Sequence, residues 1–197
     1  VYTIQITGNI THIDFHSVTQ LIELSQWGSL NLHDGRYIFM GCRRLKITAI
    51  DQPNLKNVSD LSSMFANCEM LEGDLSHWDV SNVRDMNYMF YNANKFNGDI
   101  SQWNVSKVTN MEKMFYKTTN FNCNLSNWDV GNVTNMNEMF FCASEFNSDI
   151  SKWDVSNVTN MSRMFHNATQ FNGDISNWDV SNVIDMNFMF SEAREFN

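Results

Sequence analysis

The 197-residue chain contains a single proline, eight glycines and four cysteines. This scarcity excludes a collagen and a Pro/Gly-rich low-complexity chain, and a hydrophobic content of 43% excludes an intrinsically disordered segment. No apolar run approaches the roughly 20 residues that a membrane helix needs, so we expect no membrane insertion of this segment. No C-x-x-C pair and no Gly-rich phosphate loop occur either, which leaves zinc and nucleotide sites without support.

Basic residues are also few, since 13 Lys and Arg face 22 Asp and Glu and the formal net charge is -9. Nucleic-acid binding needs a basic stripe, so no nucleic-acid partner is expected. The five histidines (His12, His16, His33, His77 and His166) share no spacing, and no G-x-S-x-G elbow is present. We therefore expect no enzyme, no catalytic residues and no cofactor.

Aromatic residues, in contrast, recur at a fixed interval of 25. The series are Trp78, Trp103, Trp128, Trp153 and Trp178, and Phe65, Phe90, Phe115, Phe140, Phe165 and Phe190, each of these phenylalanines preceded by Met. A fixed step of this size indicates a solenoid of stacked repeats. Stacked in register, the Met, Phe and Trp side chains are expected to form its core, with the tryptophans buried.

Residues 83–107 show what one repeat predicts. Val83, Met86, Met89 and Phe90 follow the spacing of one helical face, whereas the polar alternation around Trp103 is typical of a strand. The serines before each apparent helix are placed as N-caps (Ser81, Ser106, Ser156 and Ser181). The predicted fold class is an α/β repeat, a right-handed leucine-rich-repeat-like solenoid of short parallel strands and short helices.

The string GDISNWDVSNVIDMNFMF at 173–190 resembles the BspA-like leucine-rich-repeat surface proteins, in the 25-residue form of the mycoplasma lipoproteins (DUF285). Residues 58–197 then comprise five 25-residue repeats plus a partial sixth, and 31–57 a divergent first repeat in which Phe39 to Phe65 spans 26. Residues 1–30 are predicted to be an N-terminal cap, with a β-hairpin at Gly8-Asn9 and a helix over SVTQLIELSQW. Because the chain stops inside a repeat, further repeats or another domain are expected after it.

Two sets of polar residues leave alternatives open. Asp74, Asp99, Asp149 and Asp174, like the row from Asp79 to Asp179, either cap turns or hold a row of cations; turn capping is favoured because no shaped calcium loop appears. Cys42 and Cys68 stack in neighbouring repeats and are either buried free thiols or a disulfide. The Asn-x-Ser/Thr sequons, such as Asn132-Val-Thr, are expected by chance in an Asn-rich repeat.

The positions that vary between repeats predict where partners bind. The uniform acidic row discriminates poorly, so we expect a partner protein on the variable helix side and its adjoining turns, or end-on at the last, C-terminal coil. The predicted partner-binding residues are Tyr88, Tyr91, Glu112, Lys113, Tyr116, Glu138, Phe141, Arg163 and Phe188. The resemblance implies a non-catalytic protein-interaction or adhesion module, on the cell surface or extracellular, whose partners are host-surface proteins, matrix proteins or neighbouring subunits. The alternative is a structural component of a virion, such as a giant-virus capsid protein.

Overall fold

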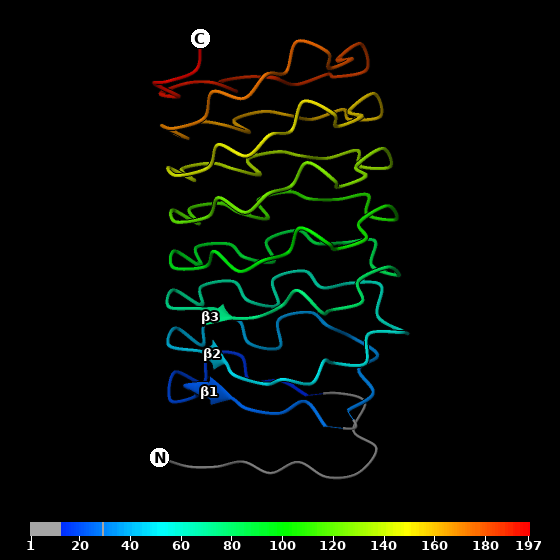
Figure 1. Cartoon of the computed structure of the whole chain (residues 1–197), viewed down its shortest axis with the longest axis vertical. Helices are drawn as coiled ribbons and strands as arrows, with labels where there is room; N and C mark the ends of the chain where they lie inside the picture. The colour runs from blue at the N-terminus through cyan, green and yellow to red at the C-terminus, as the bar shows by residue number, and fades with distance from the viewer. Residues whose placement is uncertain (1–12, 29) are drawn as a thin grey trace.

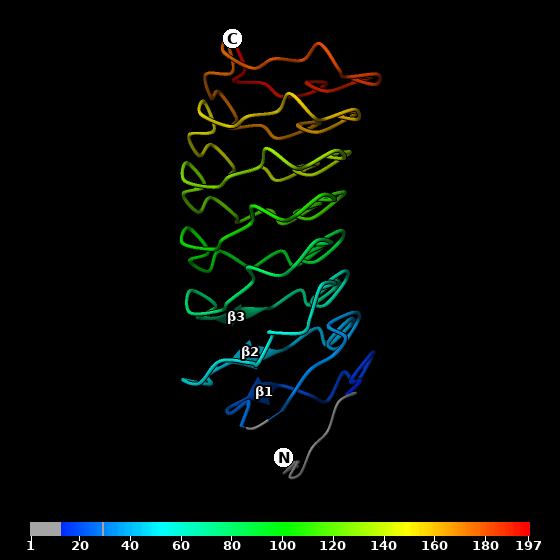
Figure 2. The same ribbon diagram turned by 90° about the vertical axis from the view of Figure 1, so that its right-hand side faces the viewer.

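The computed structural model describes residues 13–28 and 30–197. These residues wind into coils that follow one another along the long axis of the molecule, from blue to red in Figure 1, and Figure 2 shows the same layering from the side. The strands of the described chain are β1 (Glu23–Leu24), β2 (Lys46–Ile47) and β3 (Glu72–Gly73). They form one parallel sheet of order β1-β2-β3. No described segment is a helix that could span a lipid bilayer.

The expected α/β repeat is wrong, because residues 13–28 and 30–197 contain no α-helix. The predicted helix at 83–93 is instead a chain of tight turns, closed by hydrogen bonds from the N–H of Met89 to the carbonyl of Met86 and from that of Ala93 to that of Phe90. Between these turns the backbone N–H groups point along the stack. Those of Tyr88 and Phe90 donate to carbonyls of the next coil at 2.8 and 2.9 Å. An α-helix would need the same N–H groups for its own carbonyls.

The spacing of apolar residues does not distinguish a helix from successive tight turns, because such turns also place every third side chain on the same face of the chain. The apolar spacing of Val83, Met86, Met89 and Phe90 therefore fits a chain of turns as well as a helix. The backbone settles the matter, since Tyr88 and Asn92 have φ values of 56° and 57°. Such left-handed values interrupt a right-handed helix twice within five residues.

The predicted strand around Trp103 is also misplaced. There the N–H of Trp103 and that of Val108 close turns onto the carbonyls of Ile100 and Val105. Coil-to-coil pairing lies elsewhere, in a column of isolated parallel bridges that joins Asp60, Asp85, Asn110, Asn135, Asn160 and Asp185. Because Asp and Asn at this column accept a hydrogen bond from the N–H two residues later, the chain turns immediately after each bridge.

The core consists of aromatic columns that run the length of the stack. The rings of Phe39, Phe65, Phe90, Phe115, Phe140, Phe165 and Phe190 lie 5.5–5.8 Å from one another and are nearly parallel. A second column packs against it, with Phe90 and Phe96 only 4.1 Å apart. The predicted burial of the tryptophans is confirmed, since Trp78 to Trp178 are 3–9% exposed. This interior leaves each coil little of its own core, so its stability depends on its neighbours.

The extra residue of the first repeat lies between Ile47 and Lys56. Lys46 pairs with Glu72, an offset of 26 residues. From Lys56 onward the register is regular. The side-chain amide of Asn82 donates to the carbonyl of Lys56, 26 residues earlier, and the amide of Asn132 donates to the carbonyl of Ser106 across the same separation. The additional residue bulges outward and leaves Ile50 fully exposed.

Only part of the predicted N-terminal cap, from residue 13 onward, lies within the described residues. Its hairpin rests on residues 1–12, which lie outside the described residues. The helix expected over SVTQLIELSQW is wrong, since turns from Phe15 to Leu21 lead into β1. The N–H of Ser17 donates to the carbonyl of Met40 in the next coil at 2.7 Å, the same use of the backbone as in the later coils.

Candidate interaction face

The predicted partner-binding residues lie on two consecutive turns of each coil. In the coil that begins at Val83, these turns carry Tyr88 and Tyr91. Cross-coil hydrogen bonds such as that from Tyr88 N–H to Glu112 carbonyl, 2.8 Å, hold successive coils in register and so place these side chains in columns. We call this surface the ladder face and define it by Tyr88, Tyr91, Glu112, Lys113, Tyr116, Glu138, Phe141, Arg163 and Phe188.

An aromatic ladder forms one column of the ladder face. Tyr91 stacks on Tyr116, Tyr116 on Phe141 and Phe141 on His166, with ring centroids 4.6 Å apart at each step. The rings lie within 13° of parallel. Each inner ring thus covers its neighbour's face, which leaves ring edges and the tyrosine hydroxyls for contact with a partner. Stacking of a flat sugar or base onto these inner faces is blocked.

A hydrogen-bonded cluster lies beside the first rung of this ladder. The ammonium of Lys113 donates to the hydroxyl of Tyr88 at 2.9 Å and pairs with Glu112 at 3.0 Å. Tyr88 in turn donates to Glu112 at 3.2 Å, and its ring lies 5.4 Å from that of Tyr91. Burial acts to lower the pKa of Lys113, but the hydrogen bonds to Tyr88 and Glu112 outweigh it, so the pKa is raised and the ammonium stays charged.

A third group of ladder-face side chains, after the aromatic ladder and the Lys113 cluster, lies further along the stack. Arg163 pairs with Glu138 at 3.4 Å and places its guanidinium 5.6 Å from the ring of Phe188. The Glu138 side chain is 13% exposed, whereas Phe188 is 64% exposed. Arg163 therefore presents an anchored positive charge next to an exposed aromatic ring, a combination enriched at protein interfaces.

The first position of the ladder face has the same backbone conformation in five successive coils. Tyr88, Lys113, Glu138, Arg163 and Phe188 all have φ between 53° and 58°. The turn requires this left-handed geometry, which costs an L-residue other than glycine roughly 1–2 kcal/mol. Five different side chains nonetheless occupy a position that suits glycine.

Sequence reasoning missed His166 as a member of the ladder. The signal was present, because His166 follows Phe141 by one repeat, but a lone histidine among aromatic residues gives no pattern by residue type. The structure places its ring against Phe141 and leaves its Nδ1 buried without a hydrogen-bond partner in the part of the chain that is described. The next position of the column is Ser191, whose small side chain does not extend the stack.

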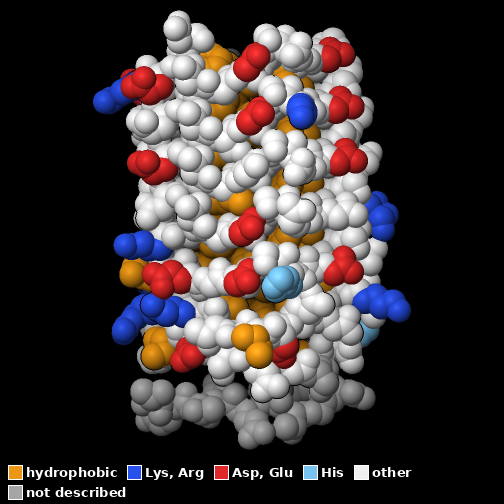
Figure 3. Space-filling view, in the orientation of Figure 1, with side chains coloured by type: hydrophobic (Ala, Val, Ile, Leu, Met, Phe, Trp, Pro, Cys, Tyr) orange, Lys and Arg blue, Asp and Glu red, His pale blue; other side chains and the backbone are white. Residues whose placement is uncertain are grey.

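The acidic rows cap turns. Each of their carboxylates or amides accepts a hydrogen bond from the N–H two residues later, as Asp149 does from Ser151 at 2.9 Å. Hydrogen bonds from Ser76, Ser101, Ser151 and Ser176 lower the pKa values of the first row. The prediction of Ser81, Ser106, Ser156 and Ser181 as helix N-caps is wrong, since their backbone N–H groups donate to the carboxylates or amide of the second row. The acidic side chains recur in columns in Figure 3, and no group of three potential metal ligands occurs within the described residues.

The four cysteines are free thiols. The thiols of Cys42 and Cys68 donate to the carbonyls of Phe15 and Phe39 in the preceding coil, at 3.2 and 3.0 Å. Thr118 makes the same bond to Phe90 with its hydroxyl at 2.8 Å, whereas Ala93, Ala143, Ala168 and Ala193 hold the equivalent position without a donor, so the position requires a small side chain. Burial raises the pKa of Cys42 to about 11 and that of Cys68 further, so neither is a reactive thiolate at neutral pH.

A family model described as "Mycoplasma protein of unknown function, DUF285" matches residues 33–140 and 119–197. The chain belongs to this family. The two matches cover the regular repeats, so the ladder face is part of the DUF285 region. Comparisons with curated proteins and with solved structures found no match.

Proposed function

We propose that this DUF285 domain is a non-catalytic module that binds other proteins through the ladder face, at the surface of a cell. The observation that carries the proposal is the aromatic ladder with its flanking charges. Tyr91, Tyr116 and Phe141 are held at 4.6 Å spacing, and Lys113 is fixed by Tyr88 and Glu112. Side chains that are immobilised in the free protein lose little further entropy when a partner docks, which favours affinity.

Specificity supports the ladder face over the acidic rows. On the ladder face the equivalent position reads Tyr88, Lys113, Glu138, Arg163 and Phe188, whereas the acidic rows repeat Asp or Asn in every coil. A surface whose chemistry changes from coil to coil offers a partner a unique register. A uniform row offers many equivalent registers, so it attracts basic groups without selecting among them.

The proposed location rests on the likeness of the repeat string to BspA-like surface proteins, together with membership of the DUF285 family. On that basis the partners are host-surface or matrix proteins, or neighbouring subunits. A structural role in a virion would use the same face between copies of the chain, so self-association is the outcome that distinguishes the two.

Site-specific crosslinking in the native context tests the proposal. A photoreactive phenylalanine is placed at Lys113 or Arg163 on the ladder face, and at Lys152 or Asn127, which are exposed on the side of the acidic rows, as matched controls. We expect discrete heterologous adducts from the ladder-face positions alone. Adducts only from the control positions would contradict the proposal, and adducts only between copies of the chain would favour the virion alternative.

A charge exchange provides a second measurement on the partner so identified. Exchanging Arg163 and Glu138 for each other preserves net charge and reverses the local pattern of the ladder face. We expect this double variant to weaken binding more than the double variant Asp129→Asn and Asp154→Asn, which neutralises part of the acidic rows. The opposite ranking would move the binding site to the acidic side.

A further inference from the structure

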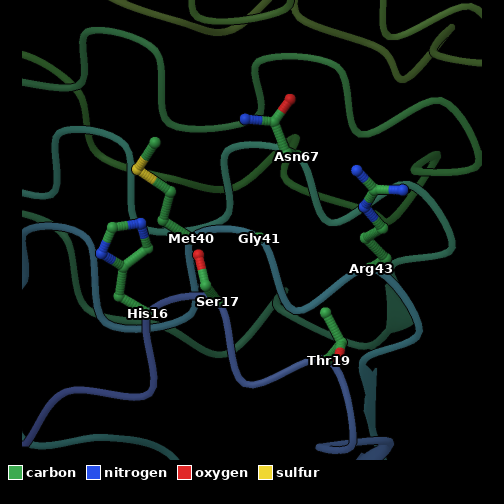
Figure 4. A pocket seen from close by; sticks show the side chains of 7 residues that line it. All are labelled: His16, Ser17, Thr19, Met40, Gly41, Arg43 and Asn67. Atoms are coloured by element: carbon green, nitrogen blue, oxygen red, sulfur yellow. The ribbon is translucent and has the colours of Figure 1, made fainter.

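An open hollow of about 570 Å³ lies among the first described coils, outside the ladder face. Figure 4 shows the residues that line it: His16, Ser17, Thr19, Met40, Gly41, Arg43 and Asn67. Arg43 is the only Lys, Arg, Asp or Glu among them. Three of the other six residues carry a hydroxyl or an amide group, so the lining differs from the apolar interior and from the acidic rows.

Cross-coil hydrogen bonds hold the backbone around the hollow. Ser17 and Gly41 have φ values of 60° and 77°, and their N–H groups donate to the carbonyls of Met40 and Ala66, each at 2.7 Å. A Cβ atom added to Gly41 would approach the Ser17 hydroxyl to 3.2 Å. The glycine therefore leaves room at the point where the Ser17 side chain enters the hollow.

The polar groups of the lining are mainly hydrogen-bond donors. The amide oxygen of Asn67 accepts a hydrogen bond from Asn92 at 3.1 Å, which fixes the orientation of the amide and leaves its Nδ2 for a ligand. The Nε of Arg43 lies 3.5 Å from Glu69, and its two Nη groups carry the remaining donors. The hydroxyl of Ser17, which points upward beside Gly41 in Figure 4, completes the set.

We infer that this hollow binds one anionic oxygen group, a phosphate or a carboxylate. A guanidinium and an oriented amide N–H are complementary to such a group, and Arg is suited to bidentate recognition of it. The whole chain carries a net charge of -9, so an anion gains nothing from the overall field and must be held by these local donors. The inference is independent of the proposed protein-binding role, because none of the lining residues belongs to the ladder face.

Titration of the full chain with sodium phosphate, followed by amide NMR shifts at constant ionic strength, tests the inference. We expect saturable shifts at Ser17, Gly41, Arg43 and Asn67, and a loss of affinity of at least about tenfold in Arg43→Gln, as for a hydrogen bond to a charged group. Arg44→Gln is the matched control, since it removes the same charge from the next, exposed residue and leaves the lining intact.

Asn67→Asp is a second variant, which replaces the donor with a carboxylate and is expected to abolish binding. A parallel titration with sodium acetate distinguishes the source of the anion: preference for acetate indicates a protein carboxylate, and preference for phosphate a free or esterified oxyanion. Unchanged resonances from residues 108–182 verify that each variant folds. Shifts that do not saturate, or equal weakening by Arg43→Gln and Arg44→Gln, would overturn the inference.

Discussion

The indole Nε1 of Trp128 donates a hydrogen bond of 3.0 Å to the carbonyl oxygen of Ile100 in the preceding coil. Trp103, Trp153 and Trp178 make the equivalent bond at 2.9–3.2 Å. Each of these tryptophans therefore joins two coils in two ways, through its buried ring and through a hydrogen bond to a carbonyl that also closes a turn in the coil before.

Two substitutions separate these contributions. Trp128→Ala removes most of a buried side chain and is expected to cost roughly 3–5 kcal/mol of the free energy of unfolding. Trp128→Phe retains a ring but removes one of the two hydrogen bonds to the Ile100 carbonyl, which still accepts from the Trp103 N–H, so the expected cost is about 0.5–1.5 kcal/mol. Urea denaturation measures both, with Asp129→Ala as the exposed neighbour that should cost much less. Equal losses in Trp128→Ala and Asp129→Ala would contradict the burial assigned here.

Glycine is expected to be favoured where the turns require left-handed backbone. Lys117 has φ of 55°, so Lys117→Gly should be more stable than Lys117→Ala by about 1 kcal/mol. Lys95 is similarly exposed and has no such φ, so there the alanine variant should be the more stable one. Thermal denaturation of the four variants checks this reversal, and alanine leading at both positions would refute it.

The acidic rows predict a loss of stability in acid. Hydrogen bonds from Ser N–H groups lower the folded-state pKa values of Asp149 and Asp174 below their unfolded values, near 3.9. Their stabilisation is thus complete above the unfolded pKa and disappears as pH falls through the folded pKa. Urea midpoints measured between pH 7 and pH 2.5 should decline below about pH 4. The double variant Asp149→Asn and Asp174→Asn should decline less, because Asn124 makes the same hydrogen bond without titrating.

Asp85 should behave in the opposite way. Its burial, with Asp60 and Glu112 nearby, raises its pKa, so the charged form opposes folding at neutral pH. Asp85→Asn is expected to raise the free energy of unfolding at pH 7, since Asn110 and Asn135 hold equivalent positions with the same turn hydrogen bond. The penalty from Asp85 is complete above the folded pKa and absent below the unfolded value, so the gain should disappear in acid. An equal gain at pH 7 and pH 3 would show that charge is not its cause.

The repeat length and the buried columns could be predicted from the sequence, whereas the backbone conformation could not. The 25-residue recurrence of apolar side chains identifies Phe90 and Trp103 as buried, because residues that are apolar in every repeat form the shared core. The path between them depends on where each N–H finds its acceptor, and for Tyr88 that acceptor belongs to Glu112 of the next coil. Local propensity carries no information about a hydrogen bond between residues 24 apart, so the sequence predicts a helix and a strand where the structure has turns.

Prediction of the ladder face had a similar limit. Variation between repeats identifies Tyr91, Tyr116 and Phe141 as free of the core, and their 25-residue step places them in adjacent coils. That their rings stack face to face, and that His166 continues the stack, depends on the exact direction of each side chain on its turn. The hollow at Ser17 and Asn67 gave no sequence signal, because its residues come from separate coils of the irregular first part of the chain.

The regular spacing of the cross-coil bonds also bears on how the length of such a protein can change. The N–H of Phe90 reaches Met114, that of Phe115 reaches Met139 and that of Phe140 reaches Met164, always through the same atoms. Removing or duplicating one whole unit from this region therefore leaves every remaining donor opposite an equivalent acceptor. Unequal recombination between repeats of the gene can shorten or lengthen the stack by whole coils while each product retains a complete set of partners.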